Sequence, residues 1–304
     1  MNNKDNSSVA PLPPIVFIVS PPRAGSTILF QLLSHRYCLH YPDKLACRLT
    51  RSGWPGLGFA VSGLLQRYGR GHNSFTSQLG FVKGQRLVLP DECGDLFHRY
   101  LPRHGQFDCR TAPNVQGLAN FLRQRARRTQ IPLLLKNLVV DNWIDSLGKA
   151  LVESRFIRIR RNPFYCAQSL LLARRRKGLA SETPLGPLPR ETSVLPRAEH
   201  DLVAMQIMGL EQQLDEDLAP LIAQGRATDL SYGALLANPE ARLIELADFM
   251  GGIVPRRNSP LPDLDRQVES LRLDPKDAQQ LWTSLKAYGA PATMRPPDLA
   301  RESV

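Results

Sequence analysis

The segment IVFIVSPPRAGSTILFQLL, residues 15–33, decides the fold of this chain. Its first five residues are apolar and mostly β-branched, which predicts a short buried strand over residues 15–19. From Ile28 onward the apolar residues recur at helical spacing, which predicts a helix that begins at Gly25 or Ser26. A strand that runs through a turn of small residues into a helix is the plan of a phosphate-binding loop. The unpaired N–H groups and the positive dipole end at such a helix start favour an anion.

The loop departs from the pattern of nucleoside triphosphatases. In the motif G-x-x-x-x-G-K-[ST], Ser20 stands where the first Gly belongs, and Ser26 stands where the Lys belongs. The cation of this loop is Arg23 instead. The departure argues against ATP or GTP chemistry, although Thr27 as a Mg²⁺ ligand keeps a P-loop kinase or NTPase as one alternative. A tight turn without a ligand is the simplest alternative.

A second strand-turn-helix unit supports a bound anion independently. Residues 155–160 alternate charged and apolar side chains and predict a strand, and Asn162-Pro163 is typical of the start of a helix that runs to residue 176. Arg161 lies in the turn and Ser169 lies about one and a half helical turns further on, so both can reach one anion. Two such sites at the carboxyl ends of parallel strands suit a nucleotide that is phosphorylated at both ends.

These motifs resemble the two signatures of sulfotransferases that use 3′-phosphoadenosine 5′-phosphosulfate (PAPS). The matching residues are P-R-A-G-S-T at 22–27 and R-N-P-x5-S at 161–169, and a third similar segment, S-Y-G-A-L-L-A-N-P-E, lies at 231–240. The resemblance covers residues 15–251. It implies that Arg161 and Ser169 hold the 3′-phosphate and that Tyr232 contacts the adenine. It also implies that the first loop holds the 5′-phosphosulfate through Arg23, Ala24, Gly25, Ser26 and Thr27.

The same resemblance implies an enzyme that moves a sulfuryl group from PAPS to a hydroxyl of a carbohydrate, lipid or small metabolite, with no metal. Lys136 ends a predicted strand in L-L-L-K-N and is a candidate cation near the transferring group. For the general base we prefer Glu92 to Asp43, and Asp43 to His40. Glu92 lies in L-P-D-E-C-G-D, which looks like the P-S-E-C-G stretch of some bacterial-type members, and a partly buried Glu can act near neutral pH. A member that binds nucleotide without catalysis is a milder variant of this hypothesis.

Length and net charge limit the possible fold class and the kind of ligand. The chain has 304 residues and a formal net charge of +11 with a pI near 9.8, which fits one α/β domain with an anionic ligand. A non-catalytic protein that binds nucleic acid is a further alternative. Charge alone supports it, because the arginine runs at 123–128 and 174–177 lack interleaved aromatic residues. We therefore expect no specific nucleic-acid partner and interpret both runs as solvated helix ends.

The cysteines indicate reduced thiols. There are five, an odd number at wide spacing, at positions 38, 47, 93, 109 and 166. Cys38 and Cys47 lie near His35 and His40, but no spacing is typical of zinc ligands, so we expect no metal site. No stretch approaches the apolar length of a membrane span, and no secretory leader is evident. These features predict a soluble cytoplasmic protein.

The remaining sequence divides into three parts. Residues 1–14 are polar and proline-rich and are expected to be disordered, residues 15–254 form the α/β domain, and residues 255–304 form an extension that can pack on it. Arg256 and Arg257 in that extension are candidates for a family R-K-G element that this chain lacks. Residues 50–110 show no sustained period and are interpreted as an insertion that forms the acceptor pocket. Residues 178–196, with four prolines, are expected to fold over the site or stay mobile.

The other elements follow from local patterns. Residues 132–136 predict a buried strand, Asp141 is expected to cap a helix over Ile144 and Leu151, and residues 228–232 predict another short strand. An apolar stripe from Val203 to Leu218 predicts a long helix that packs on the sheet. A last helix is expected to begin at residue 239 and to end at residues 251–252. The repeated strand-helix-strand order predicts a central parallel sheet flanked by helices.

Overall fold

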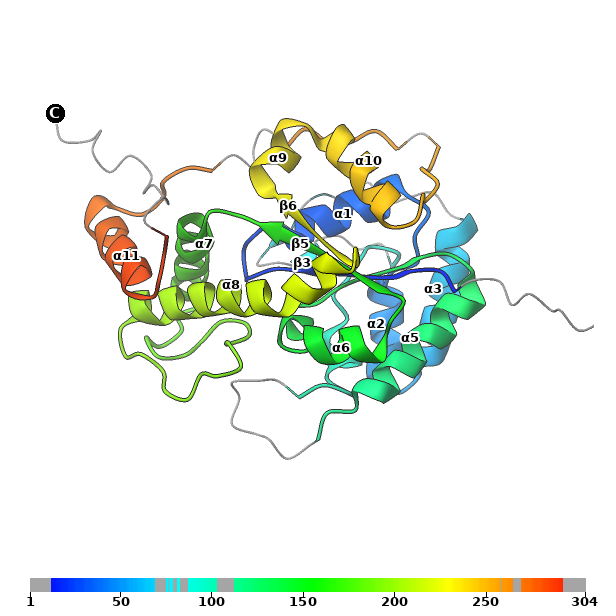
Figure 1. The fold of residues 1–304 in the computed structure, drawn as a ribbon, viewed down its shortest axis with the longest axis horizontal. Coiled ribbons are helices and arrows are strands. Elements are labelled where there is room, and N and C mark those ends of the chain that lie inside the picture. Colours follow the sequence, from blue (N-terminus) through cyan, green and yellow to red (C-terminus); the bar gives the residue numbers. More distant parts are fainter. Residues whose placement is uncertain are drawn as a thin grey trace, which may run out of the picture.

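A four-stranded parallel sheet organises the protein. The structure is a computed structural model that describes residues 12–68, 75, 77–78, 81–82, 87–102, 112–257, 259–264 and 269–291. In these residues the central sheet has the order β4-β1-β5-β6, and all neighbouring strands are parallel. Figure 1 shows β5 beside β6, with helices around the sheet. The predicted α/β fold is therefore confirmed. The strand bounds are β1 Ile15–Val19, β4 Leu133–Lys136, β5 Ser154–Arg160 and β6 Ala227–Ser231.

The central strand β1 is buried on both faces. Val16 and Ile18 belong to one hydrophobic cluster, and Ile15, Phe17 and Val19 belong to the other. This alternation follows from the two-residue period of a strand. Two apolar layers are therefore needed to cover the sheet, and an apolar run without polar alternation is typical of such a strand.

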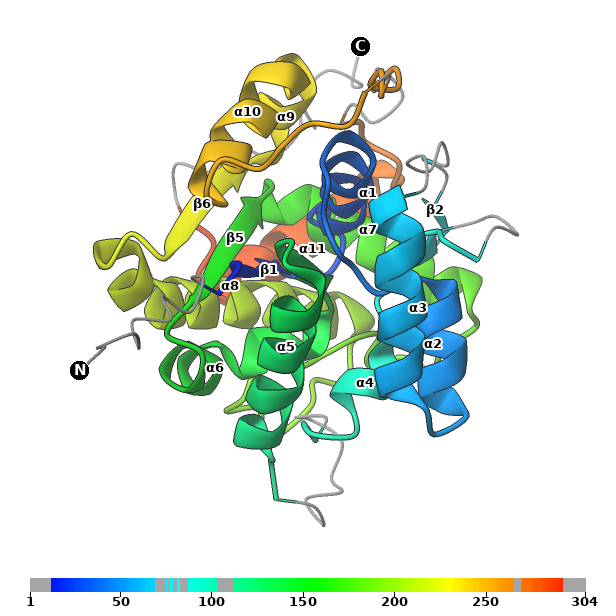
Figure 2. The same ribbon diagram turned by 90° about the vertical axis from the view of Figure 1, so that its right-hand side faces the viewer.

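Helices supply both layers. Figure 2 shows α1, α9 and α10 on one side of the strands, and α5, α6 and α8 on the other. The remaining helices flank these layers. The bounds are α1 Ser26–Arg36, α2 Lys44–Arg51, α3 Pro55–Tyr68, α4 Gly94–Phe97, α5 Val115–Thr129, α6 Ile144–Ala150, α7 Pro163–Arg176, α8 Glu199–Ala223, α9 Tyr232–Ala237, α10 Pro239–Phe249 and α11 Pro275–Ala287, with a 3₁₀ helix at Leu138–Asn142 and a small hairpin of β2 Ser77–Gln78 and β3 Phe81–Val82.

The strand order fixes where a ligand can bind. The chain passes from β1 to β4 on one side and then returns to β5 on the other side of β1. The connections therefore diverge at the carboxyl ends of β1 and β5, which is where ligands bind in open parallel sheets. The loop at residues 20–25 follows β1, and Arg161 follows β5, so both predicted phosphate motifs lie at this switch point.

Residues 50–110 contain more regular structure than the sequence indicated. The 14-residue helix α3 lies within this segment, and its glycines permit close packing. A Cβ at Gly58 would lie 2.9 Å from the Ala46 carbonyl oxygen of α2. The buried face of α3 includes Ser62 and Gln66, whereas Leu57 and Leu64 are exposed. Because polar residues of α3 are buried and leucines are exposed, the sequence has no buried apolar stripe that would predict this helix.

Two other expectations are corrected, one for Asp141 and one for Tyr232. Asp141 does not cap a helix, because it lies inside the 3₁₀ helix and α6 begins after Trp143. Tyr232 begins α9 and does not end β6. The chain beyond residue 255 contains α11, which packs on α7 and α8 and buries Leu281 in the main core. Residues 1–11 and Cys109 lie outside the described residues.

Candidate active site

The loop after β1 has left-handed backbone at two residues and leads into the amino end of α1. Arg23 and Gly25 both have left-handed backbone, with φ of 70° and 104°. Gly25 is the N-cap of α1, and a Cβ there would lie 2.5 Å from the Tyr232 ring. Only glycine permits both this backbone and this contact. As a result, the amino end of α1, with Ser26 and Thr27, faces the pocket.

The loop lines a pocket, and Arg23, Arg161 and Ser169 lie together at one end of it. The Arg23 Nε donates to Ser169 Oγ at 3.0 Å, and Arg161 Nη1 donates to the Arg23 carbonyl oxygen at 3.1 Å. The Arg161 guanidinium lies 4.6 Å from the centroid of the Tyr232 ring. The four residues come from two βα turns, from α7 and from α9. The sequence analysis paired Arg161 with Ser169, whereas in the structure Ser169 bonds to Arg23.

The electrostatics of this end favour an anion. Burial, and next the positive charge of Arg161, lower the pKa of the Arg23 guanidinium. A bound anion would relieve this repulsion. In the structure the Glu269 carboxylate supplies one negative charge, since its Oε1 accepts from Arg161 Nε at 2.9 Å. Glu269 comes from the C-terminal extension, and no local motif marks it.

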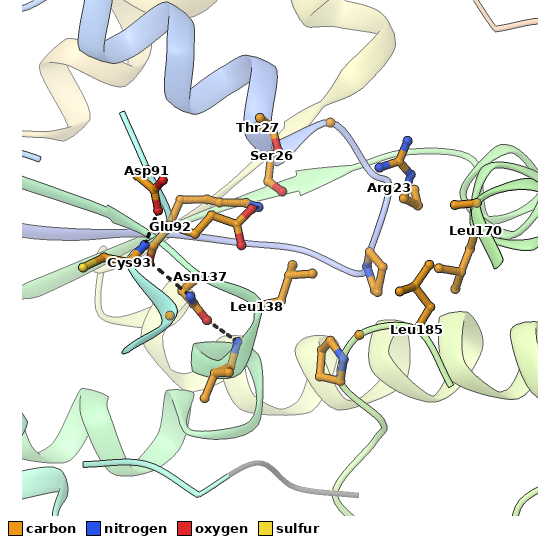
Figure 3. Close-up of a pocket in the computed structure, with 18 of the residues that line it drawn as sticks. Arg23, Ser26, Thr27, Asp91, Glu92, Cys93, Asn137, Leu138, Leu170 and Leu185 are labelled. Atoms are coloured by element: carbon orange, nitrogen blue, oxygen red, sulfur yellow. Dashed lines mark hydrogen bonds and ion pairs between the residues drawn. The ribbon is translucent and has the colours of Figure 1, made fainter. Parts of the chain in front are cut away.

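Glu92 and Lys136 form an ion pair at the other end. The pair is enclosed, with the Lys136 side chain 3% exposed and that of Glu92 17% exposed. Asn137 Nδ2 donates to the Glu92 carbonyl oxygen at 3.1 Å, and Asp91 Oδ1 accepts from the Cys93 N–H at 2.9 Å. Figure 3 shows Glu92 and Arg23 at opposite sides of the pocket, with Ser26 and Thr27 between them.

The residue after Glu92 has a left-handed backbone conformation. Cys93 has a left-handed φ of 48°, although it is not glycine. Such strain is concentrated at functional sites, and among the described residues it occurs at three non-glycine positions, of which Arg23 and Cys93 both border the pocket. Asn137 and Asp91, which hold this turn, were missed by the sequence analysis. Their positions in the sequence, directly next to Glu92 and Lys136, could have indicated them.

One cavity joins the two ends. Its volume is about 920 Å³, which is near the upper end of the usual range for ligand sites. Residues 184–188 form part of the wall, and Gln206 Nε2 anchors them through the Leu185 and Pro187 carbonyl oxygens at 3.1 and 2.7 Å. The proline-rich segment thus borders the site, as does part of the predicted insertion, residues 87–98.

Four other candidate residues are not brought to the cavity. Asp43 is fully buried and caps α2, with its oxygens accepting from Ala46 N, Ser62 Oγ and Gln66 Nε2 at 2.8, 2.7 and 3.0 Å. Ala24 packs into the core, and His40 is buried beside Phe59, where desolvation lowers its pKa to about 4. Arg256 donates to the carbonyl oxygens of Tyr37 and Gln66 instead.

Among the described residues, no cluster of three or more His, Cys, Asp or Glu side chains could hold a metal ion. No helix in this part of the chain has the length and apolar character of a membrane span.

The interpretation of both arginine runs as solvated helix ends is corrected in part, because several of these side chains bond within the protein. Arg123 pairs with Glu153, Arg125 donates to the Gly56 carbonyl oxygen, and Arg174 is buried against the loop carbonyls at 180–183.

Comparison with known proteins gives one family. The model of the "Sulfotransferase family" matches residues 14–254. Similar solved structures include the sulfotransferase domain from the curacin biosynthetic pathway, with 18% identity, a TM-score of 0.45, and 85% of this chain and 79% of that chain covered. A second is the sulfotransferase domain of the Synechococcus PCC 7002 olefin synthase, with 15% identity, a TM-score of 0.46, and 91% of this chain and 95% of that chain covered. A third is the sulfotransferase STF1 from Mycobacterium tuberculosis H37Rv, with 15% identity, a TM-score of 0.45, and 92% of this chain and 74% of that chain covered. No curated protein sequence matches the chain.

Proposed function

Since this chain belongs to the sulfotransferase family, we propose that its sulfuryl donor is PAPS and that its acceptor is a hydroxyl group. One observation carries the proposal. The anion-binding cluster of Arg23, Arg161 and Ser169 shares a single cavity with the Glu92–Lys136 pair. A nucleotide with phosphates at both ends and a nearby acceptor would use both parts of that cavity.

The residues fit the groups of the donor. Arg161 and Ser169 would hold the 3′-phosphate, and the Tyr232 ring would contact the adenine. Ser26, Thr27 and the backbone N–H groups at the start of α1 would hold the 5′-phosphosulfate. Arg23 belongs to this loop but donates to Ser169, so its charge serves both ends of the nucleotide.

The proposed reaction needs no covalent enzyme intermediate. The acceptor oxygen attacks sulfur, the bond from sulfur to the 5′-phosphate oxygen breaks, and 3′-phosphoadenosine 5′-phosphate (PAP) leaves. The acceptor proton passes to the Glu92 carboxylate. As Glu92 becomes neutral, Lys136 loses its partner and its charge becomes available to the transferring group or the leaving phosphate. Asp43 is not retained as a base, because its carboxylate caps α2 away from the cavity.

The acceptor is proposed as a carbohydrate, a lipid or a small metabolite. We also propose a cytoplasmic location, since Cys38, Cys47, Cys93 and Cys166 are free thiols, which is usual in reducing compartments.

The test follows the conversion of PAPS to PAP by the wild-type protein and by Glu92→Gln, with water and a panel of hydroxyl compounds as acceptors. We expect Glu92→Gln to retain PAP binding and to lower turnover by roughly 10²–10⁴-fold, the usual contribution of a general base. Glu245→Gln is the matched control, because the Glu245 side chain is exposed on α10 and does not line the cavity. Undiminished turnover in Glu92→Gln would transfer the role to another residue, and no PAP formation by the wild-type protein would contradict the proposal.

A further inference from the structure

One wall of the cavity is apolar. Residues 138–139 are Leu-Val, residues 184–188 are Pro-Leu-Gly-Pro-Leu, and all seven residues line the cavity. None of the seven has a polar side chain. We call this surface the apolar wall. Figure 3 shows its Leu138 and Leu185 across the cavity from Ser26, at the start of α1 where the phosphosulfate is proposed to bind.

Buried side-chain amides hold the apolar wall from behind. Gln206 Nε2 donates to two carbonyl oxygens of residues 184–188, at 3.1 and 2.7 Å. Gln206 is fully buried and does not line the cavity, so these two peptide oxygens are turned away from it. Asn142 Nδ2 donates to the Leu188 carbonyl oxygen at 2.9 Å, and Asn142 belongs to the same 3₁₀ helix as Leu138. This bond joins the two parts of the wall, which presents leucine and proline side chains to a ligand.

Two leucines of the wall lie outside the protein core. Leu138 is partly buried and Leu188 is 2% exposed, but neither belongs to the two hydrophobic clusters that the described residues form. Leu185, in contrast, packs against one of these clusters. A ligand in contact with Leu138 would therefore remove apolar surface from water that folding alone leaves in the cavity. Such burial favours an apolar ligand.

The polar groups of the cavity lie on its other sides. The donor cluster occupies one end, and the Glu92–Lys136 pair occupies the other. The side formed by α2 and α4 carries charges of both signs, with Asp95 accepting from Arg51 Nη2 at 3.0 Å. A compound between the wall and the phosphosulfate can therefore place one hydroxyl at Glu92 while its carbon skeleton contacts the wall. An apolar lining with a few placed polar groups is typical of small-molecule sites.

We infer that the acceptor is an alcohol with an apolar carbon skeleton, whose hydroxyl lies at Glu92 and whose skeleton lies along the apolar wall. The inference rests on the proposed function, because it chooses among the acceptors proposed above. A carbohydrate would place several hydroxyl groups against leucine and proline side chains, which form no hydrogen bonds with them, so their desolvation would not be compensated. An alkyl chain or a hydrocarbon ring would bury apolar surface on both partners.

The experiment measures ligand binding to the PAP-saturated protein by calorimetry, with 1-butanol, 1-octanol, cyclohexanol and myo-inositol as probes. Each buried methylene group should tighten binding by up to about fourfold, so we expect 1-octanol to bind at least about tenfold more tightly than 1-butanol. Cyclohexanol and myo-inositol share a six-carbon ring but carry one and six hydroxyl groups. We expect cyclohexanol to bind at least about tenfold more tightly than myo-inositol.

A substitution in the wall tests where the probes bind. Leu138→Gln places an amide in the wall and should weaken 1-octanol binding at least about fivefold, with PAP affinity unchanged. Because Leu138 lies outside both hydrophobic clusters, the variant should fold, and a thermal unfolding curve checks this. Leu57→Gln is the matched control, since Leu57 is 53% exposed on α3 and does not line the cavity. It should keep the wild-type affinities.

The outcomes separate the acceptor from the donor. Equal binding of 1-butanol and 1-octanol, tighter binding of myo-inositol than of cyclohexanol, or an equal loss in Leu57→Gln would overturn the inference. PAP binding is measured in the same series. Its absence in the wild-type protein would contradict the proposed donor, whereas PAP binding without a preference for apolar alcohols would contradict the acceptor inference alone.

Discussion

Replacement of Arg161 by alanine tests the donor site most selectively. The Arg161 side chain is 15% exposed, and its guanidinium lies over the Tyr232 ring, where the proposed 3′-phosphate would reach it. The substitution removes a charge-assisted hydrogen bond to the phosphate, and such bonds contribute roughly 1.5–3 kcal/mol. Arg161 also pairs with Glu269, and this partly exposed pair is worth roughly 0.2–1 kcal/mol that a nucleotide bound as proposed would have to displace.

The difference between these contributions sets the expected effect. A net loss of about 2 kcal/mol corresponds to roughly 30-fold weaker binding of PAP. Binding of 5′-AMP, which lacks the 3′-phosphate, should change by less than about threefold. Calorimetric titration with both nucleotides gives the ratio directly, and a thermal unfolding curve checks that the variant is folded.

Arg160→Ala is the matched control. Arg160 is the preceding residue in the chain, but it pairs with Asp215 and Asp229 and does not line the cavity. PAP binding should be unchanged in this variant. If Arg161→Ala weakened PAP and AMP equally, or if Arg160→Ala weakened PAP as much, Arg161 would not be the ligand of the 3′-phosphate.

Three further predictions follow from single contacts. Glu269→Gln removes the carboxylate that pairs with Arg161 and that a 3′-phosphate bound there would have to displace. It should therefore tighten PAP binding by about two- to fivefold in the same titration, whereas weaker binding would contradict the proposed competition. Gly25→Ala places a Cβ against the Tyr232 ring and should weaken PAP binding at least about tenfold, and unchanged affinity would show that the loop is not constrained as described. The hydrogen-bonded ion pair with Arg175 lowers the pKa of Asp277 to about 2. The pair's contribution to the free energy of unfolding is therefore complete above the unfolded pKa of 3.8 and is lost as the pH falls through about 2. In urea unfolding, Asp277→Asn should lose less stability between these pH values than the wild type, and an equal loss in both proteins would contradict this prediction.

Local patterns predicted the parts of the site that lie within one βα unit. The strand, loop and helix around Gly25 could be identified because a run of five apolar, mostly β-branched residues is followed, within the same 19 residues, by apolar residues at helical spacing. Arg161 and Ser169 could be paired because Asn162 and Pro163 fix where α7 begins. The structure brings these residues together at the switch point between β1 and β5.

Long-range contacts limited the rest. The ion pair of Lys136 with Glu92 spans 44 residues, so no spacing could reveal it, although both residues had been selected separately. Asp43 was selected as a candidate base, but in the structure its carboxylate caps α2 and accepts from Ser62 and Gln66. These two polar residues lie on the buried face of α3, so no apolar stripe marked that helix in the sequence. Glu269 enters the site from an extension that carries no motif.

The proposal that PAPS is the donor is tested most directly by calorimetry, which compares the affinity of the wild-type protein for PAP, for AMP and for ATP with Mg²⁺. PAP carries both phosphates that the two motifs are proposed to hold, AMP lacks the 3′-phosphate, and ATP with Mg²⁺ is the ligand of a kinase or NTPase. We expect PAP to bind at least about tenfold more tightly than either of the others. A preference for ATP with Mg²⁺, or no binding of PAP, would contradict the proposed PAPS-dependent activity.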